Sequence, residues 1–154
     1  MPDASSRMAA SQHLMDTILQ LLQRTTLHAE ECAPYVATAF QSDFYDDFRY
    51  YVEIGEKHYL LRQYERGRLE AEYRTKRAED VIYLVLEDVI HDLTHRKLLQ
   101  KYKVDDASSY LKNTESIRME LTAGINECFR QIGGVYEQWH ESGRRRTFES
   151  RQRL

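Results

Sequence analysis

The 154-residue sequence predicts an α+β fold in which a three-stranded antiparallel β-meander packs against helices. Three observations predict this class. Apolar side chains recur every three or four residues toward both ends of the chain, they alternate with polar ones in the middle, and glycines separate the alternating segments. We expect a flexible N-terminus over residues 1–11, a single domain over residues 12–142, and a basic C-terminal tail over residues 143–154.

The first predicted helix covers residues 12–32, because apolar side chains recur along one of its faces. Pro34 lacks a backbone donor and restricts the residue before it, so we expect this helix to end at about Ala33. Aromatic and acidic residues then mix without a regular period over residues 35–47. We interpret this segment as a loop or a short irregular helix on the surface.

Three strands are predicted within residues 49–54, 59–64 and 68–74, where apolar and polar side chains alternate. Gly55 and Gly67 lie in the short breaks between these segments, as the tight turns of a meander require. The outward row of the third strand is entirely charged and is expected to face water. Because three strands alone are marginally stable, the inward row needs a helix to cover it.

The covering helix is predicted to begin near Thr75, a favourable N-cap residue, and to continue to about Lys101. One apolar stripe along it is assigned to the sheet. Two further helices are predicted over residues 114–132 and 135–141, and the glycine pair between them ends the first.

Composition argues against several classes of protein. Hydrophobic residues make up 42% and charged residues 31% of the chain, which is typical of a globular domain. No stretch approaches the roughly 18 apolar residues that a bilayer requires. Cys32 and Cys128 are far apart in the chain, which favours neither a disulfide scaffold nor a thiolate zinc site. We therefore expect a cytoplasmic protein with two free thiols.

Charge is unevenly distributed along the chain. The tail over residues 143–154 carries five arginines and one glutamate, a net +4, which leaves −7 on the rest of a chain whose total is −3. Residues 29–56 alone contain seven carboxylates and one arginine. Such a patch favours a basic partner through complementary electrostatic fields, although solvation of the surface is the simpler alternative.

A second function class is a metal-dependent hydrolase. His91 and His95 are four residues apart on the predicted long helix, and with Asp92 they differ from the His-Glu-x-x-His zinc motif only by Asp for Glu. Glu87, one turn earlier, is the candidate third ligand. The pair is expected opposite the apolar stripe, beside Glu87 and Asp88, where a solvated surface is a simpler interpretation than a catalytic cleft.

A third class is nucleic-acid binding. The arginines of the tail are candidates for phosphate contacts, and Phe148 is a candidate for stacking on a base. The acidic body would repel nucleic acid, and we expect a frayed helix end with solvated arginines instead.

The tyrosines favour protein binding. The chain contains 11 tyrosines, and many of them lie among the carboxylates of residues 35–51. Tyrosine is a large, stiff interface residue, and neighbouring carboxylates provide recognition of lysine or arginine. We predict a protein-contact surface formed by Asp43, Tyr45, Asp46, Asp47, Glu53 and Glu56. A second candidate face comprises Glu87, Asp88 and His91.

Several short motifs between residues 59 and 139 occur in a familiar order. They are Tyr64-Glu65-Arg66-Gly67, then Glu79-Asp80-Val81-Ile82-Tyr83 with Glu87, then Ser116-Ile117-Arg118-Met119, Ile132-Gly133 and Trp139. This order resembles the bacterial immunity protein 63 family, from which Leu84 and Ile117 depart. The resemblance implies a small α+β protein, without catalysis or cofactor, that neutralises a secreted polymorphic toxin in the cell that produces it. Its partner would be the C-terminal domain of that toxin, and a basic nuclease is one candidate class. The resemblance implies no toxin-contacting residues.

Overall fold

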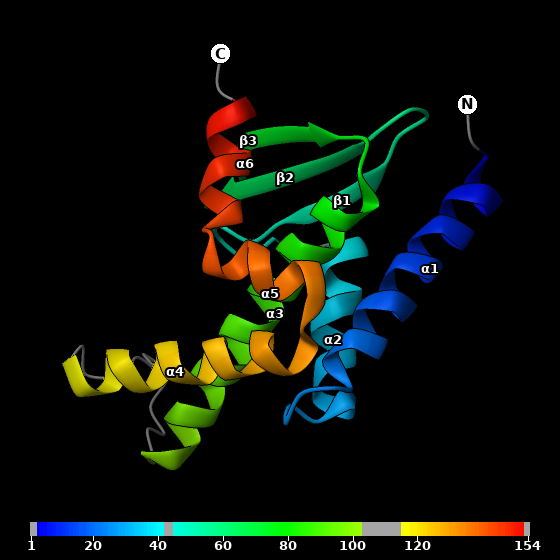
Figure 1. Cartoon of the computed structure of the whole chain (residues 1–154). Helices are drawn as coiled ribbons and strands as arrows, with labels where there is room; N and C mark the ends of the chain where they lie inside the picture. Colours follow the sequence, from blue (N-terminus) through cyan, green and yellow to red (C-terminus); the bar gives the residue numbers. More distant parts are fainter. Residues whose placement is uncertain (1–2, 42–44, 103–114, 153–154) are drawn as a thin grey trace.

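The computed structural model describes residues 3–41, 45–102 and 115–152, which form one three-stranded sheet and six helices (Figure 1). This arrangement confirms the predicted α+β class. In chain order the elements are α1 Ala4–Leu22, α2 Ala29–Phe40, β1 Tyr51–Ile54, β2 Tyr59–Glu65, β3 Arg68–Thr75, α3 Ala78–Lys101, α4 Glu115–Ile132, α5 Gly134–Glu141 and α6 Arg144–Gln152.

The sheet is the predicted antiparallel meander, with β2 between β1 and β3. Leu61 of β2 lies opposite Val52 of β1 and Tyr73 of β3, and all three side chains are buried. At the β2–β3 turn both Arg66 and Gly67 have positive φ, 51° and 79°, which is the pattern of a type I′ turn. The turn therefore matches the right-handed twist of the strands that it joins.

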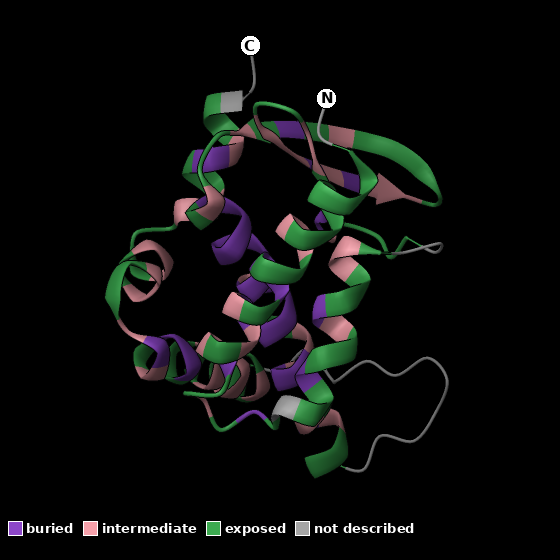
Figure 2. Cartoon of the chain, turned by 90° about the vertical axis from the view of Figure 1, so that its right-hand side faces the viewer, coloured by how far each residue is buried: buried purple, intermediate pink, exposed green. Residues whose placement is uncertain are grey.

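The long helix α3 forms the centre of the core (Figure 2). It packs against α1, α2, α4 and both β2 and β3, so it is covered on almost every side. Tyr83, Leu84 and Ile90, which lie outside the predicted stripe, are as deeply buried as Val85, which belongs to it. The prediction of a single apolar stripe is therefore wrong, because a helix that is apolar on most of its circumference can be surrounded by other elements.

The first helix begins earlier and ends earlier than the sequence predicts. Helix α1 begins at Ala4, within the segment expected to be flexible, and Asp3 caps it by accepting a 2.7 Å hydrogen bond from the Ser6 amide. It ends at Leu22, where the Thr25 hydroxyl donates to the Leu22 carbonyl at 2.6 Å and so competes with continuation of the helix.

Pro34 lies inside α2 instead of ending a helix. Because α2 begins only at Ala29, the proline falls in its second turn and removes one amide donor near the N-terminal end. Residues 35–40, predicted as loop or irregular helix, are part of this regular helix.

The basic C-terminal segment is also different from the prediction. Residues 144–152 form helix α6, whose Phe148 is buried with its ring 5.7 Å from that of Tyr73 on β3. The Arg144 and Arg145 side chains are only 14% and 26% exposed, and both form ion pairs with carboxylates of α3. The expectation of solvated arginines is wrong for these two, because α6 packs against the body.

No described helix is both long enough and apolar enough to span a bilayer.

Candidate functional site

The segment between α2 and β1 carries the central part of the predicted contact surface. We call residues 45–50 the contact loop; Asp43 lies outside the described residues. Aromatic contacts position its first half: the Tyr45 ring stacks on that of Tyr64 at 4.0 Å and meets the edge of the Tyr51 ring at 4.8 Å. The Asp46 amide also donates to the Tyr51 hydroxyl at 2.7 Å. These contacts tie the loop to β1 and β2.

The second half of the contact loop is attached to the β2–β3 turn. The Asp47 carboxylate accepts a 2.9 Å hydrogen bond from the Arg66 amide, and the Phe48 amide donates to the Tyr64 carbonyl at 3.1 Å. Asp46 and Asp47 nevertheless remain exposed. The loop therefore presents two carboxylates on a backbone that the sheet holds in place.

Phe48 is the unexpected member of this loop. Its φ is +63°, in the left-handed region that residues with a Cβ seldom adopt, and its side chain is 57% exposed. Its carbonyl points inward and accepts hydrogen bonds from Gln63 Nε2 and Arg145 Nη2, both at 3.3 Å. Phe48 is not among the residues that the sequence predicts for the contact surface, because neither its backbone conformation nor its exposure can be read from the pattern of residue types.

Tyr50 anchors the end of the loop in the core. It is 1% exposed, its amide donates to Asp88 Oδ2 at 2.8 Å, and its hydroxyl donates to Glu149 of α6. The Arg145 guanidinium lies 4.8 Å from the centre of its ring. Burial and the hydrogen bond to Glu149 both raise the pKa of Tyr50, so it stays protonated as a donor.

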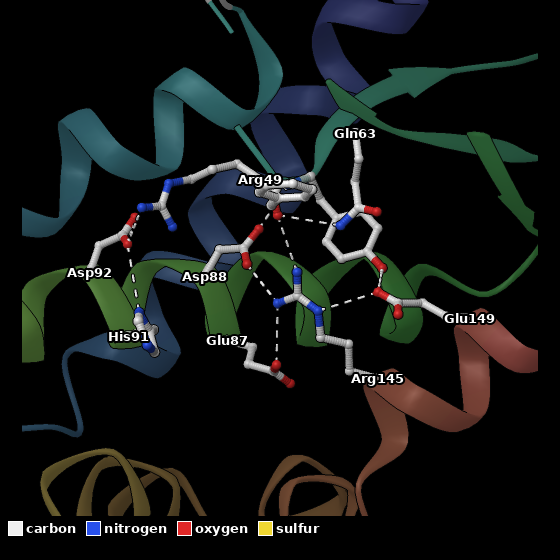
Figure 3. A network of polar contacts seen from close by, with 10 residues as sticks. Arg49, Gln63, Glu87, Asp88, His91, Asp92, Arg145 and Glu149 are labelled. Atoms are coloured by element: carbon white, nitrogen blue, oxygen red, sulfur yellow. Dashed lines mark hydrogen bonds and ion pairs between the residues drawn. The ribbon is translucent and has the colours of Figure 1, made fainter. Parts of the chain in front are cut away.

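Arg145 is the centre of the polar network beneath the loop (Figure 3). It reaches Asp88 Oδ1 at 2.8 Å, Glu87 Oε1 at 3.2 Å and Glu149 Oε1 at 3.4 Å. Burial alone would lower the pKa of Arg145, but the charges of Asp88 and Glu87 outweigh it and raise that pKa. Burial raises the pKa of Asp88, against the lowering effects of the Arg145 charge and the Tyr50 amide.

Two members of the second candidate face, Glu87 and Asp88, therefore form ion pairs within the molecule. Asp88 is 8% exposed and supports the loop from below, so its predicted place on a solvated surface is wrong. Glu87 is half-buried beside Arg145, whereas the His91 side chain is 54% exposed. The neighbouring Asp92 pairs with Arg49 of the contact loop.

The structure brings the two predicted surfaces together. Asp47 and Phe48 of the loop line a groove of about 860 Å³ with Glu87 and His91 of α3; we call it the α6 groove, because Arg146 and neighbouring residues of α6 form its other wall. The loop and the second face thus belong to one continuous surface.

The remaining predicted residues lie farther along the sheet. Glu53 is on β1, where it pairs with Arg62 at 2.5 Å and shares a shallow pocket with Tyr45. Glu56 is exposed in the turn between β1 and β2, beyond the end of β1 that is distant from the loop. Glu53 therefore extends the surface that begins at Tyr45, whereas Glu56 stands apart from it.

The proposed metal ligands are brought only partly together. The His91 and His95 rings are nearly parallel, with centroids 6.5 Å apart, but the Glu87 carboxylate is turned to Arg145. The Asp92 carboxylate is paired with Arg49 and is not directed at a shared metal position. Within the described residues, no group of three or more His, Cys, Asp or Glu side chains is arranged to hold a metal ion.

A second cleft lies on the other side of the contact loop. Its volume is about 390 Å³, and it runs between α2 and α3. Tyr35, Tyr50 and Tyr51 line it together with the Arg49–Asp92 pair. The contact loop therefore separates two hollows, one on each of its sides.

Comparisons with protein-family models, with curated proteins and with solved structures find no match to this chain. The resemblance to the immunity protein 63 family therefore stays a prediction.

Proposed function

We propose that this protein is an immunity protein, which binds the toxin domain of a secreted bacterial polymorphic toxin and neutralises it by direct contact in the cytoplasm of the producing cell. The observation that carries the proposal is the contact loop, which exposes Asp46, Asp47 and Phe48 on a backbone fixed by at least four hydrogen bonds. An exposed aromatic side chain surrounded by polar side chains, on a rigid support, has the arrangement of a protein-contact surface, in which aromatic residues are enriched at the centre and polar residues form the rim.

Rigidity of the loop supports binding because it reduces the entropy that is lost on association. The Tyr45–Tyr64 stack, the Asp47 bond to the Arg66 amide and the buried Tyr50 restrain the loop before any partner arrives. A preorganised surface of this kind can hold a partner tightly without a large interface.

Exposed carboxylates on the loop support a basic partner. Complementary charge accelerates association and disfavours unsuitable partners, and both effects weaken as salt is added. Toxins that act on nucleic acid need basic clefts, so a basic nuclease domain is the candidate class that fits the loop best. In this interpretation the inhibitor covers the cleft and catalyses nothing.

The proposal requires that a gene beside this one encode a secreted protein with a C-terminal toxin module, and the test is co-expression with that module. We expect the wild-type chain to restore growth and to co-purify with that module, with association that slows as salt increases. Asp46→Lys should weaken protection because it reverses a charge on the loop; among the described residues no cation pairs with the Asp46 carboxylate. Asp16→Lys, an equal charge change on an exposed position of α1, is the control and should protect normally.

Two results would count against the proposal in different ways. A wild-type chain that neither binds nor protects against the module rejects the immunity function. Full protection by Asp46→Lys keeps the function but rejects the contact loop as the site.

A further inference from the structure

We infer that Phe48 is the anchor residue of the contact loop, and that the partner receives its ring in an apolar pocket flanked by lysine or arginine side chains. This inference rests on the proposed function and specifies the feature of the toxin domain that the loop recognises.

The backbone conformation of Phe48 is unusual for a residue with a side chain. A phenylalanine at φ +63° is strained relative to glycine or asparagine at the same position, because its Cβ crowds the backbone. Burial of the ring does not compensate for this strain, since 57% of the side chain is exposed. Strained, exposed residues that the surrounding structure holds in place occur preferentially at functional sites.

Hydrogen bonds from two elements hold Phe48 in this conformation. Both backbone polar groups of Phe48 are engaged: the amide donates to the Tyr64 carbonyl, and the carbonyl accepts from Gln63 and Arg145. These bonds come from β2 and α6, so the two elements together fix the direction in which the ring leaves the surface. An aromatic ring with a fixed direction loses little entropy when it enters a pocket.

Acidic residues predominate in the grooves on either side of Phe48. Phe48 lines both the α6 groove and a neighbouring groove of about 600 Å³, which we call the β3 groove because residues of β3 form much of it. Carboxylates outnumber arginines in each. The α6 groove contains Asp47, Glu87, Asp88, Glu141 and Glu149 with Arg49, Arg145 and Arg146. The β3 groove contains Glu70, Glu72 and Glu149 with Arg145.

Phe48 is therefore an apolar ridge between two acid-lined grooves. A complementary surface has an apolar pocket for the ring and basic side chains on both sides of it, which is the chemistry of a nucleic-acid-binding cleft. A second copy of this chain is a poor occupant, because an isologous contact would bring these carboxylates toward one another.

The experiment compares Phe48→Asn with Leu69→Thr, using the toxin module encoded beside the gene as the probe. Asparagine tolerates positive φ, so Phe48→Asn removes the ring without disturbing the loop. Leu69 is 53% exposed on β3, so its replacement removes a similar area of exposed apolar surface. We expect Phe48→Asn to weaken binding by about tenfold or more, as loss of a hot-spot residue does, and Leu69→Thr to leave it unchanged.

A second variant, Phe48→Trp, reports directly on burial of the side chain at position 48 through its fluorescence. The chain has one tryptophan, Trp139, which is half-buried. A tryptophan at position 48 therefore adds fluorescence from a second indole, which is exposed to solvent in the free protein. We expect that emission to shift to shorter wavelength when the module binds, because the ring leaves water.

The outcomes distinguish failure of the anchor role of Phe48 from failure of the immunity function. Wild-type affinity in Phe48→Asn, or no shift in a Phe48→Trp complex, overturns the anchor role and leaves the immunity function standing. No binding by the wild-type chain rejects both proposals at once.

Discussion

Replacing Arg145 with glutamine should destabilise the protein and loosen the contact loop. The substitution keeps much of the side chain's length but removes the cation that Glu87, Asp88 and Glu149 share. It also removes the Nη2 donor to the Phe48 carbonyl at 3.3 Å. Arg145 is the only described cation that pairs with Asp88, whose side chain is 10% exposed.

The magnitude follows from the burial of the three carboxylates. Removing one partner of a fully buried ion pair costs about 3–5 kcal/mol. The Arg145 side chain is 26% exposed, so water screens part of the interaction, and we expect a loss of about 2–3 kcal/mol in the free energy of unfolding. For a domain of this size that loss lowers Tm by roughly 5–10 °C.

The assay is urea unfolding combined with hydrogen exchange. Arg146→Gln is the matched control, because Arg146 is the next residue on α6 and is exposed, so its replacement should change stability by no more than about 0.5 kcal/mol. In Arg145→Gln the amides of Phe48 and Tyr50 should exchange faster, because the variant loses the hydrogen bond to the Phe48 carbonyl and the ion pair that holds Asp88, the acceptor of the Tyr50 amide. Equal unfolding free energies for the two variants would refute the argument that Arg145 holds this region together.

The pH dependence of the unfolding free energy gives an independent check on the interaction between Arg145 and Asp88. Burial raises the folded-state pKa of Asp88 above its ordinary value, and the charge of Arg145 opposes that rise. Without Arg145 the pKa of Asp88 rises further, so the folded variant binds a proton more readily than the unfolded chain. Stability then increases as pH falls through the interval between the raised pKa and the ordinary value of 3.8. The stability deficit of Arg145→Gln relative to wild type should therefore be smaller at pH 5 than at pH 7. A deficit that grows on acidification would contradict this assignment.

Three further predictions concern the body of the protein. Gly124→Ala should lower the free energy of unfolding by about 1–3 kcal/mol in urea titrations, because the added Cβ would lie 2.8 Å from Cγ2 of Thr94 and a β-branched side chain on a helix cannot easily move. Burial raises the pKa of the Cys32 thiol to about 11, so a disulfide reagent at pH 8 should label it only in denaturant. Arg144→Gln should lower Tm by several degrees, since it leaves Asp80 buried without its 2.6 Å ion pair, and an unchanged melting curve would show that pair to be dispensable.

The meander and the long helix could be predicted because local patterns specify them. Alternation over residues 59–64 and the turn residue Gly67 define a hairpin without reference to the rest of the chain. The site could be predicted only in part. Tyr45, Asp46 and Asp47 were identified by composition, but the support of the loop depends on Arg145 and Asp88, which are 57 residues apart in the sequence. Spacing within a single sequence contains no signal for such a contact.

The errors at the two ends of the chain have a common cause. Pro34 and the arginines of α6 were interpreted from intrinsic preferences, as a helix breaker and as solvated charge. In the folded protein α2 accommodates the proline early in its length, and α6 is held by burial of Phe148. Tertiary packing overrides local preference where enough apolar surface is covered.

The folding of α6 onto α3 also changes where acidic charge remains available. Arg144 and Arg145 come from the basic segment, and they pair with Asp80, Glu87 and Asp88 of the central helix. Much of the acidity of α3 is therefore balanced inside the molecule, whereas Asp46 and Asp47 stay exposed on the contact loop. Because exposed charges determine the field that an approaching protein meets, the attraction for a basic partner is concentrated around the loop and not spread over both predicted faces. The second face then contributes mainly to the shape of the α6 groove, and the exposed Asp47 and Glu141 carry the acidic charge that a basic partner meets there.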